Sequence, residues 1–242
     1  MKSKRSQKHL VMGLALGCTS VIASAQNPEV HIHGALKNMM MNADISPQAA
    51  LSTYSGSAGW WGLGAVAGLK GEVLIWDGQP WVSSADAGQI TLRSSPETEA
   101  TLLVASQVRE WQEWPVPEGV SSQEEFEAFL AEAAEHAGLD VTQPFPFRLD
   151  GKFDSLAWHV VDWEQGDMEH TCEKHKTTGP HGVETDIETQ LLGFHSVKHH
   201  RIFTHHSTNI HVHAWLNNAG VVAHVDEMTL SDGTNLMLPK SR

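Results

Sequence analysis

Three histidines lie within the apolar segment at residues 209–225, which reads NIHVHAWLNNAGVVAHV. His211 and His213 alternate in a predicted strand, so their side chains share one face of it. A hairpin loop at residues 217–220 would pair His213 with His224, and paired Cβ atoms lie about 4.5–5.5 Å apart. Three imidazoles on one face can bind a zinc ion and leave coordination positions open, as catalytic zinc sites do. The segment therefore predicts one Zn²⁺ per chain.

Other histidines weaken this signal, because a histidine-rich segment can also bind or buffer metal ions at a surface without catalysis. Eight further residues of metal-binding type lie upstream of the hairpin: His170, Cys172, His175, His181, His199, His200, His205 and His206. We interpret the group at 199–206 as a solvated loop. The group at 170–181 fits no strong ligand spacing, and a second site with the thiolate is the alternative there. His31 and His33 repeat the alternation, and we expect them on an exposed or active-site-lining strand face, with auxiliary metal binding as the alternative.

Two charged residues stand inside otherwise apolar predicted strands. Glu72 opens the segment EVLIW, and Arg148 lies in FPFRLDG. A buried charge is costly unless it is paired or bound to a metal ion. Each of the two residues is therefore either at a strand edge in water or part of a functional site.

The elements that position these residues are mostly strands. Predicted strands cover residues 30–36, 72–76, 79–83, 91–95, 102–108, 189–194, 201–203, 209–216, 220–226, 227–231 and 235–239. Asp-Gly pairs predict hairpin turns at residues 77–78 and 150–151, and another such pair joins the last two strands at 232–233. We expect loops at residues 55–68, which are rich in glycine, and at residues 164–186, which are polar.

Helices are few in the predicted pattern. The clearest covers residues 121–136, where Ser122 and Glu125 form a capping box. A shorter helix is predicted to begin at Ser46-Pro47, with Ser as N-cap and Pro in the first turn. Many strands and two helices predict an α+β (mixed α/β) fold with mixed or antiparallel sheets, rather than regular β-α-β alternation.

The first 25 residues predict a signal peptide. A basic start precedes an apolar stretch at residues 10–22 and the small-residue sequence ASA at 23–25. Cleavage after Ala25 would place the mature protein in the periplasm or outside the cell, and a lipoprotein site at Gly17-Cys18 is the alternative. The apolar stretch is too short to span a membrane, which takes roughly 18 residues or more.

Charge and cysteine content limit the partners. Without the first 25 residues, 12 basic side chains remain against 29 acidic ones, a net charge of −17 with histidine neutral. Such a protein repels phosphates, which argues against nucleic acid and anionic membranes as partners. Cys172 is then the only cysteine, so we expect no internal disulfide.

Four segments resemble the alpha-acetolactate decarboxylase family: LKGEVLIWDGQPW, FRLDGKFDS, TQLLGF and HVHAWLNNAGVVAHV. The resemblance implies that His211, His213 and His224 bind zinc. It also implies that Glu72 is the strand glutamate near the zinc, as a ligand or proton relay. Arg148 would be the active-site arginine that orients the substrate.

The family forms acetoin from 2-acetolactate, so the resemblance implies decarboxylation of this or a similar branched 2-hydroxy-3-keto acid. Zinc would chelate the hydroxyl and ketone oxygens and stabilise the enediolate that remains after CO₂ is lost. The resemblance further implies two subdomains, at residues 26–140 and 141–242, with zinc on the C-terminal sheet. Family members are commonly homodimers.

Family members usually have a longer C-terminal tail, in which a glutamate folds back to the zinc. This sequence ends at Arg242 and shows no matching tail. Asp226 and Glu227 are nearby acidic residues, and alternation from His224 places only Asp226 on the metal face. We nevertheless expect Asp226 to be a strand-end residue in water.

Two other functions stay open. A periplasmic metal-binding or buffering protein, with the same scaffold but without catalysis, is favoured by the surplus histidines and opposed by Glu72 and Arg148. A zinc hydrolase is less favoured, because the sequence has neither an H-E-x-x-H helix nor a G-x-S-x-G turn.

Overall fold

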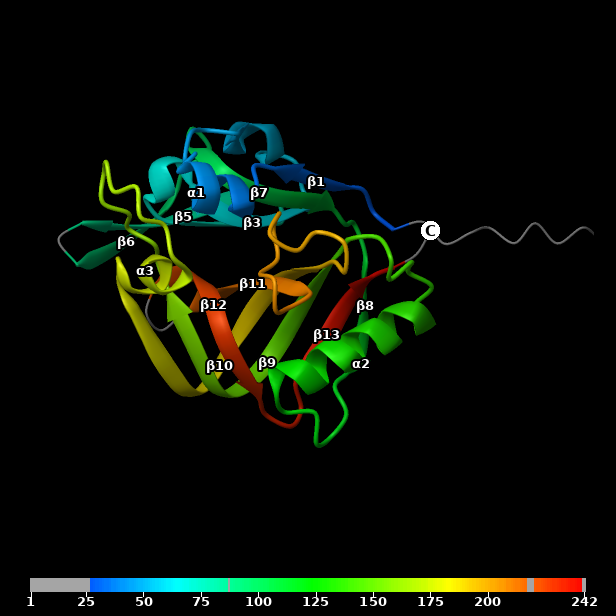
Figure 1. Ribbon diagram of the computed structural model, residues 1–242. Helices are drawn as coiled ribbons and strands as arrows, with labels where there is room; N and C mark the ends of the chain where they lie inside the picture. The colour runs from blue at the N-terminus through cyan, green and yellow to red at the C-terminus, as the bar shows by residue number, and fades with distance from the viewer. Residues whose placement is uncertain (1–26, 87, 217–219, 241–242) are drawn as a thin grey trace, which may run out of the picture.

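The computed structural model describes residues 27–86, 88–216 and 220–240, and in it two β-sheets are stacked (Figure 1). The first sheet has the order β1-β7-β3-β4-β5-β6, and β2 also pairs with β7. Its strands are β1 Val30–His33, β2 Ala49–Ala50, β3 Trp60–Val66, β4 Glu72–Trp76, β5 Gln79–Asp86, β6 Gln89–Ser94 and β7 Glu99–Gln107.

The second sheet contains the remaining strands, in the order β10-β11-β12-β9-β13-β8. They are β8 Trp111–Pro115, β9 Phe145–His159, β10 His181–His195, β11 Ile210–Leu216, β12 Val221–Leu230 and β13 Asn235–Pro239. Every strand pair in both sheets is antiparallel. With three α-helices in the described part of the chain, this confirms the predicted α+β fold.

Four strands of the second sheet close into a ring. Strand β9 pairs with β10, β10 with β11, β11 with β12, and β12 again with β9. The register makes Leu192, His213, His224 and His159 successive cross-strand partners. Directly opposed residues share a face of a sheet, so this ring brings distant segments to one row.

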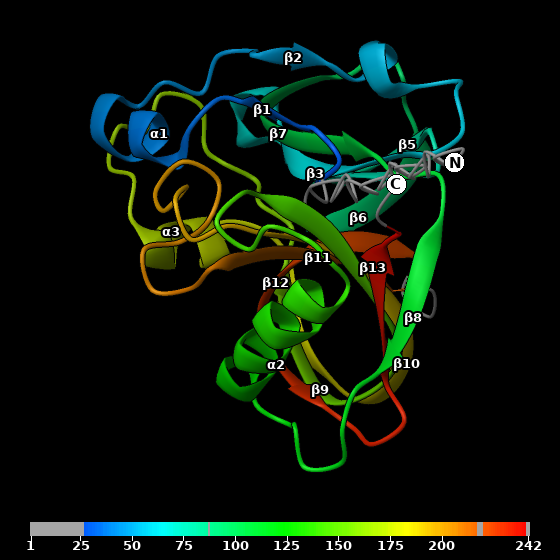
Figure 2. The ribbon, with the colours of Figure 1, turned by 90° about the vertical axis from the view of Figure 1, so that its right-hand side faces the viewer.

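Helix α2 (Gln123–His136) covers the second sheet on the side away from the first (Figure 2). Ser122 accepts a hydrogen bond from the backbone of Glu125, and the Glu125 side chain accepts one from the Ser122 backbone, which confirms the predicted capping box. Phe126 and Leu130 are fully buried, and the Phe126 ring packs on Phe147 of β9 with centroids 5.6 Å apart. The other helices, α1 (Leu36–Asn42) and α3 (Cys172–Thr177), are shorter.

The predicted hairpin at Asp150-Gly151 is wrong. Residues 145–159 form one strand, because β9 pairs continuously along β10 from Phe145 to His159 apart from one position. Gly151 instead lets another segment approach, since a Cβ there would lie 2.8 Å from the Cα of Thr234.

The glycine-rich segment predicted as a loop is also a strand over much of its length, β3. A Cβ at Gly64 would lie 1.9 Å from the carbonyl oxygen of Leu102 on β7. The glycines here allow close backbone approach inside a sheet rather than marking a loop.

Smaller differences concern the ends of elements. No helix begins at Ser46, whose backbone and hydroxyl instead bond to the Asp44 carboxylate. Residues 201–203 form a turn, residues 221–230 form one strand, and the polar region at 164–186 contains α3 and the start of β10. The turn at 232–233 joins β12 to β13, but both strands pair with β9 rather than with each other.

Residues 1–26 lie outside the described part, so the signal peptide, its Ala25 cleavage site and the Cys18 alternative stay predictions. The strands of the first sheet come from residues 30–107 and those of the second from 111–239. The division at residue 140 stays a prediction. Among the described residues, no helix is both long and apolar enough to cross a membrane.

Candidate metal centre

The histidine trio meets between the two sheets. Strands β11 and β12 pair in the predicted register, with His213 opposite His224, and residues 217–219 between them lie outside the described part. One ligand nitrogen of each of His211, His213 and His224 lies within 4.8 Å of the others. His211 Nε2 and His224 Nδ1 are 3.1 Å apart. These three side chains can hold a metal ion.

His213 is oriented by the first sheet. Its side chain is 0% exposed, and its Nδ1 donates a hydrogen bond to the Val73 carbonyl of β4 at 2.9 Å. Nε2 therefore carries the lone pair, and within the described part of the chain it has no hydrogen-bond partner. A buried, unpaired acceptor is costly, and a metal ion would satisfy it. The second nitrogen of metal-binding histidines is usually fixed in this way.

Burial keeps the three rings neutral. It lowers the pKa of His211 to about 4 and the pKa values of His213 and His224 well below the ordinary value, and neighbouring imidazoles lower them further. Because only a neutral imidazole can bind a metal ion, the rings are in the state that binding requires.

Glu72 joins the trio from the first sheet. It begins β4, is 3% exposed, and accepts a hydrogen bond from the Val161 amide at 3.1 Å. Its Oε2 lies 3.6 Å from His213 Nε2. Burial raises the pKa of Glu72 well above its ordinary value, the Val161 amide opposes this, and Asp226 adds to it. A divalent cation beside it would favour the ionised carboxylate.

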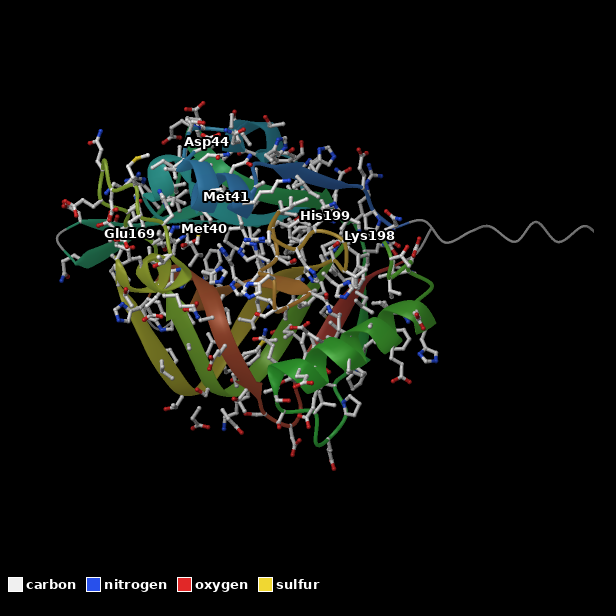
Figure 3. All side chains as sticks on the ribbon, viewed as in Figure 1. Met40, Met41, Asp44, Glu169, Lys198 and His199 are labelled. Atoms are coloured by element: carbon white, nitrogen blue, oxygen red, sulfur yellow. The ribbon has the colours of Figure 1, made fainter. Side chains whose placement is uncertain are left out.

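A cavity of about 310 Å³ opens beside these groups. Its polar wall contains Glu72, His159, His211, His224 and Asp226. Its apolar wall comes from α1, β3, β7 and neighbouring segments: Leu36, Met39, Met40, Gly64, Ala65, Leu69, Leu102 and Val161. Lysine, arginine and further histidine side chains also line it: Lys37, His175, Lys176, Arg201, His205 and His206. Figure 3 shows Met40 above a group of nitrogen-rich side chains between the two layers.

For two residues of this wall the structure differs from the sequence analysis. His159 carried no prediction, because its place opposite His224 depends on the pairing of β9 with β12. Asp226 lies on the metal face, as alternation predicts, but it is not a strand-end residue in water. A bulge between Val225 and Glu227 accompanies its turn toward His159 and Lys176.

Arg148 lies apart from this cavity. Its guanidinium carbon is 4.8, 4.6 and 5.6 Å from the ring centroids of Trp61, Trp76 and Trp111, and its Nη2 is 3.7 Å from Asp150 Oδ2. The side chain is 13% exposed and is not among the residues that line the cavity. The structure thus brings Glu72 to the trio but does not bring Arg148 there.

The remaining histidines make local contacts. His170 Nδ1 and His175 Nε2 are 2.9 Å apart, and the His170 ring stacks on Trp163. His31 and His33 both contact the Tyr54 hydroxyl, at 3.3 and 2.7 Å. Among the described residues, only His211, His213 and His224 form a group of three or more metal-binding side chains with their ligand atoms within 4.8 Å of one another.

Comparisons with known proteins identify similar sequences and folds. A model of the alpha-acetolactate decarboxylase family matches residues 31–239. Acetolactate decarboxylase from Bacillus subtilis subspecies spizizenii is 16% identical, with a TM-score of 0.69 over 89% of this chain and 87% of that one. Alpha-acetolactate decarboxylase from Bacillus subtilis strain 168 is 15% identical, with a TM-score of 0.68 over 89% and 86%.

A Staphylococcus aureus protein of unknown function, similar to alpha-acetolactate decarboxylase, is 15% identical, with a TM-score of 0.68 over 88% of this chain and 85% of its own. At such low identity these structures show a shared fold. A search of curated proteins found no match. The family model covers most of the sequence, and the chain therefore belongs to the alpha-acetolactate decarboxylase family.

Proposed function

We propose that this carboxy-lyase decarboxylates 2-acetolactate, or a similar branched 2-hydroxy-3-keto acid, to acetoin or its analogue. We further propose that it uses Zn²⁺ held by His211, His213, His224 and Glu72. The observation that carries the proposal is the group of buried, neutral imidazoles that meets Glu72 at the wall of a cavity. A ligand-sized cavity with a few convergent polar groups is the usual form of an active site.

The reaction requires a place for the electron pair that CO₂ leaves behind, and the ketone oxygen of the substrate is that place. When bound, a divalent cation supplies Lewis-acid stabilisation to the oxygens of the substrate. The chain itself supplies Glu72, whose carboxyl group lies at the cavity wall, where it can hold or transfer a proton. Apolar side chains on one wall of the cavity would reduce the water around the reacting carbons of a bound substrate.

The cavity wall also suits an anionic substrate with small alkyl groups. Lys37, Lys176 and Arg201 line it, although the whole protein is strongly acidic. Within the described part of the chain, Lys37 and Arg201 form no ion pair, so their charges are available to a carboxylate. Opposite charge at a cleft raises the local concentration of the substrate.

The direct test measures metal content and acetoin release from racemic 2-acetolactate with the chain from residue 26 onward. We expect about one tightly bound zinc and turnover that a chelator abolishes and zinc restores. Glu72→Gln should lower kcat by about a hundredfold or more, since proton transfer by one positioned group contributes about 10²–10⁴-fold. Glu164→Gln, on an exposed residue, is the control. Full turnover by Glu72→Gln would contradict the role of Glu72.

The cationic side chains that line the cavity lead to a separate prediction about KM. Arg201→Gln should raise KM for acetolactate about three- to tenfold with little change in kcat, because an exposed charge contributes on the order of 1 kcal/mol to binding. The effect should shrink in high salt, which screens exposed charges. Lys240→Gln removes a cation that pairs with Glu110 instead of lining the cavity, and KM should not change. Equal KM values for all three proteins would show that the lining does not select anions.

The contacts of Arg148 suggest that it contributes to stability, whereas the family resemblance implies that it orients the substrate. Packed among three indoles, its cation–π contacts contribute about 2 kcal/mol in a desolvated setting. Arg148→Met should therefore lower the free energy of unfolding by about 1–2 kcal/mol, while metal content and kcat stay within about twofold. Urea denaturation and the acetoin assay measure these. A kcat that falls tenfold or more in a folded variant would instead support the predicted role in orienting the substrate.

A further inference from the structure

His159 stands next to the trio in the ring of strands. It is the last residue of β9 and lies directly opposite His224 of β12. The two ring centroids are 4.8 Å apart, and the His159 side chain is 9% exposed. The ring lines the same cavity as Glu72, His211 and His224. A fourth imidazole thus faces the centre from a strand that the trio does not use.

The orientation of this ring is fixed by Asp226. His159 Nδ1 lies 2.9 Å from Asp226 Oδ2 and donates a hydrogen bond to it, while Lys176 Nζ lies 3.2 Å from Asp226 Oδ1. Two donors thus meet the Asp226 carboxylate, one on each oxygen. Because Nδ1 is the donor, Nε2 of His159 presents its lone pair to the cavity. Carboxylate-bound histidines of this kind are typical metal ligands.

Three pairs of these groups lie near the separation that a shared ion would impose. Two ligands at about 2.1 Å from a tetrahedral ion lie roughly 3.4 Å from each other. His211 Nε2 and His224 Nδ1 are 3.1 Å apart, and His213 Nε2 and Glu72 Oε2 are 3.6 Å apart. His159 Nε2 and Glu72 Oε1 are 3.9 Å apart. His159 is therefore within a small side-chain movement of the distance at which it would share an ion with Glu72.

We propose that His159 is an additional ligand of the metal ion through Nε2, and that Asp226 positions it. The inference rests on the metal centre of the proposed function and deepens it. It gives the ion a fourth nitrogen from β9, while Glu72 supplies the oxygen. Imidazole-rich sites favour ions such as Zn²⁺ and Co²⁺ over Mn²⁺ and Mg²⁺, which prefer oxygen.

The test is metal binding itself, measured with Co²⁺ by visible absorption and with Zn²⁺ by competition against a chelator of known affinity. His159→Gln should weaken Zn²⁺ binding about tenfold to a hundredfold or more and shift the Co²⁺ absorption bands. Asp226→Asn, which keeps the ring, should weaken binding about tenfold, as loss of a ligand-orienting group does. His136→Gln, on an exposed residue of α2, is the matched control and should bind like the parent. Circular dichroism of the metal-free proteins shows that each variant is folded.

The outcomes separate this inference from the proposed function. If the parent binds one ion, and His159→Gln binds it with the same affinity and spectrum, His159 is not a ligand and the proposed function is unaffected. If the parent binds no ion, the metal centre fails and this ligand fails with it. If Gln at 159 prevents folding, weakened binding by Asp226→Asn with shifted Co²⁺ bands still supports the ligand, and unchanged binding overturns it.

Discussion

Replacing His213 with glutamine should remove both the bound metal and the turnover of acetolactate. We expect zinc affinity to fall by at least about a hundredfold, because loss of a residue that only orients a ligand already costs about 10–100-fold. His213 is the most constrained of the trio, since its ring is fully buried and its other nitrogen is held by the Val73 carbonyl. Acetoin release should fall to background at equimolar zinc. Competition against a chelator and the acetoin assay measure the two losses.

The same experiment separates an enzyme from a metal buffer. His136→Gln should keep one zinc and full turnover, because its ring lies at the exposed end of α2. In the buffering alternative, several weak ions would bind, and His213→Gln would lower the stoichiometry only slightly. A variant at 213 that kept parental affinity would contradict the metal centre altogether.

The trio could be predicted from the sequence because its geometry is local. Alternation along β11 places His211 and His213 on one face, and one short hairpin brings His224 opposite. Both rules act over a few residues, so neither depends on the rest of the fold. Glu72 stood out for a similar reason, since a charged residue at the start of an apolar strand needs a partner.

The contacts of His159 and Asp226 could not be predicted, because they depend on pairing between distant segments. His159 reaches His224 only when β9 runs unbroken beyond Asp150-Gly151, where the local signal predicts a turn. Long antiparallel pairing with β10 outweighs that local preference, and Gly151 serves close packing on Thr234 instead. Alternation predicts that Asp226 lies on the metal face, but its contact with His159 accompanies a bulge in β12 for which the sequence carries no distinct signal.

The substrate-orienting role of Arg148 stays a prediction, and its contacts in the structure do not reach the histidine trio. The surrounding segment FRLDG matches, and the residue lies on β9 as expected, in the same row as Leu192. Its side chain nevertheless packs into a group of tryptophans contributed by β3, β4 and β8. The direction in which the long Arg148 side chain extends depends on its contacts with Trp61 and Trp76 of the first sheet, which the local sequence does not reveal.

Acidification should unfold the metal-free protein over an unusually mild range of pH. Burial lowers the pKa of His211 to about 4 and the pKa values of His213 and His224 well below their ordinary value, whereas all three titrate near 6.5 when unfolded. Between these values the unfolded chain binds more protons, so the free energy of unfolding falls as pH drops below about 6.5. Each histidine contributes about 1.4 kcal/mol per pH unit.

Glu72 acts in the opposite direction. Its pKa is raised by burial, so the stabilising effect of its neutral form grows as pH falls toward its unfolded value of 4.5, at up to about 1.4 kcal/mol per pH unit. Between pH 7 and pH 5 the three histidines lower the free energy of unfolding by about 5 kcal/mol, and Glu72 offsets up to about half of this decrease. The net loss of about 3 kcal/mol is a large part of a typical total stability of about 5–15 kcal/mol.

Denaturant titrations of the chelator-treated protein at pH 7.5, 6.0 and 5.0, followed by tryptophan fluorescence, measure this loss. His213→Gln should reduce the slope by about 1.4 kcal/mol per pH unit, because one proton-binding difference is removed, whereas His136→Gln should keep it. Zinc at a hundred times its dissociation constant should add about 2.7 kcal/mol at pH 7.5. That increment should disappear toward pH 5, because protons compete for the same nitrogens. A free energy of unfolding that stays constant from pH 7.5 to 5.0 would mean that the rings are not held neutral inside the fold, and the reason for placing an ion among them would be lost.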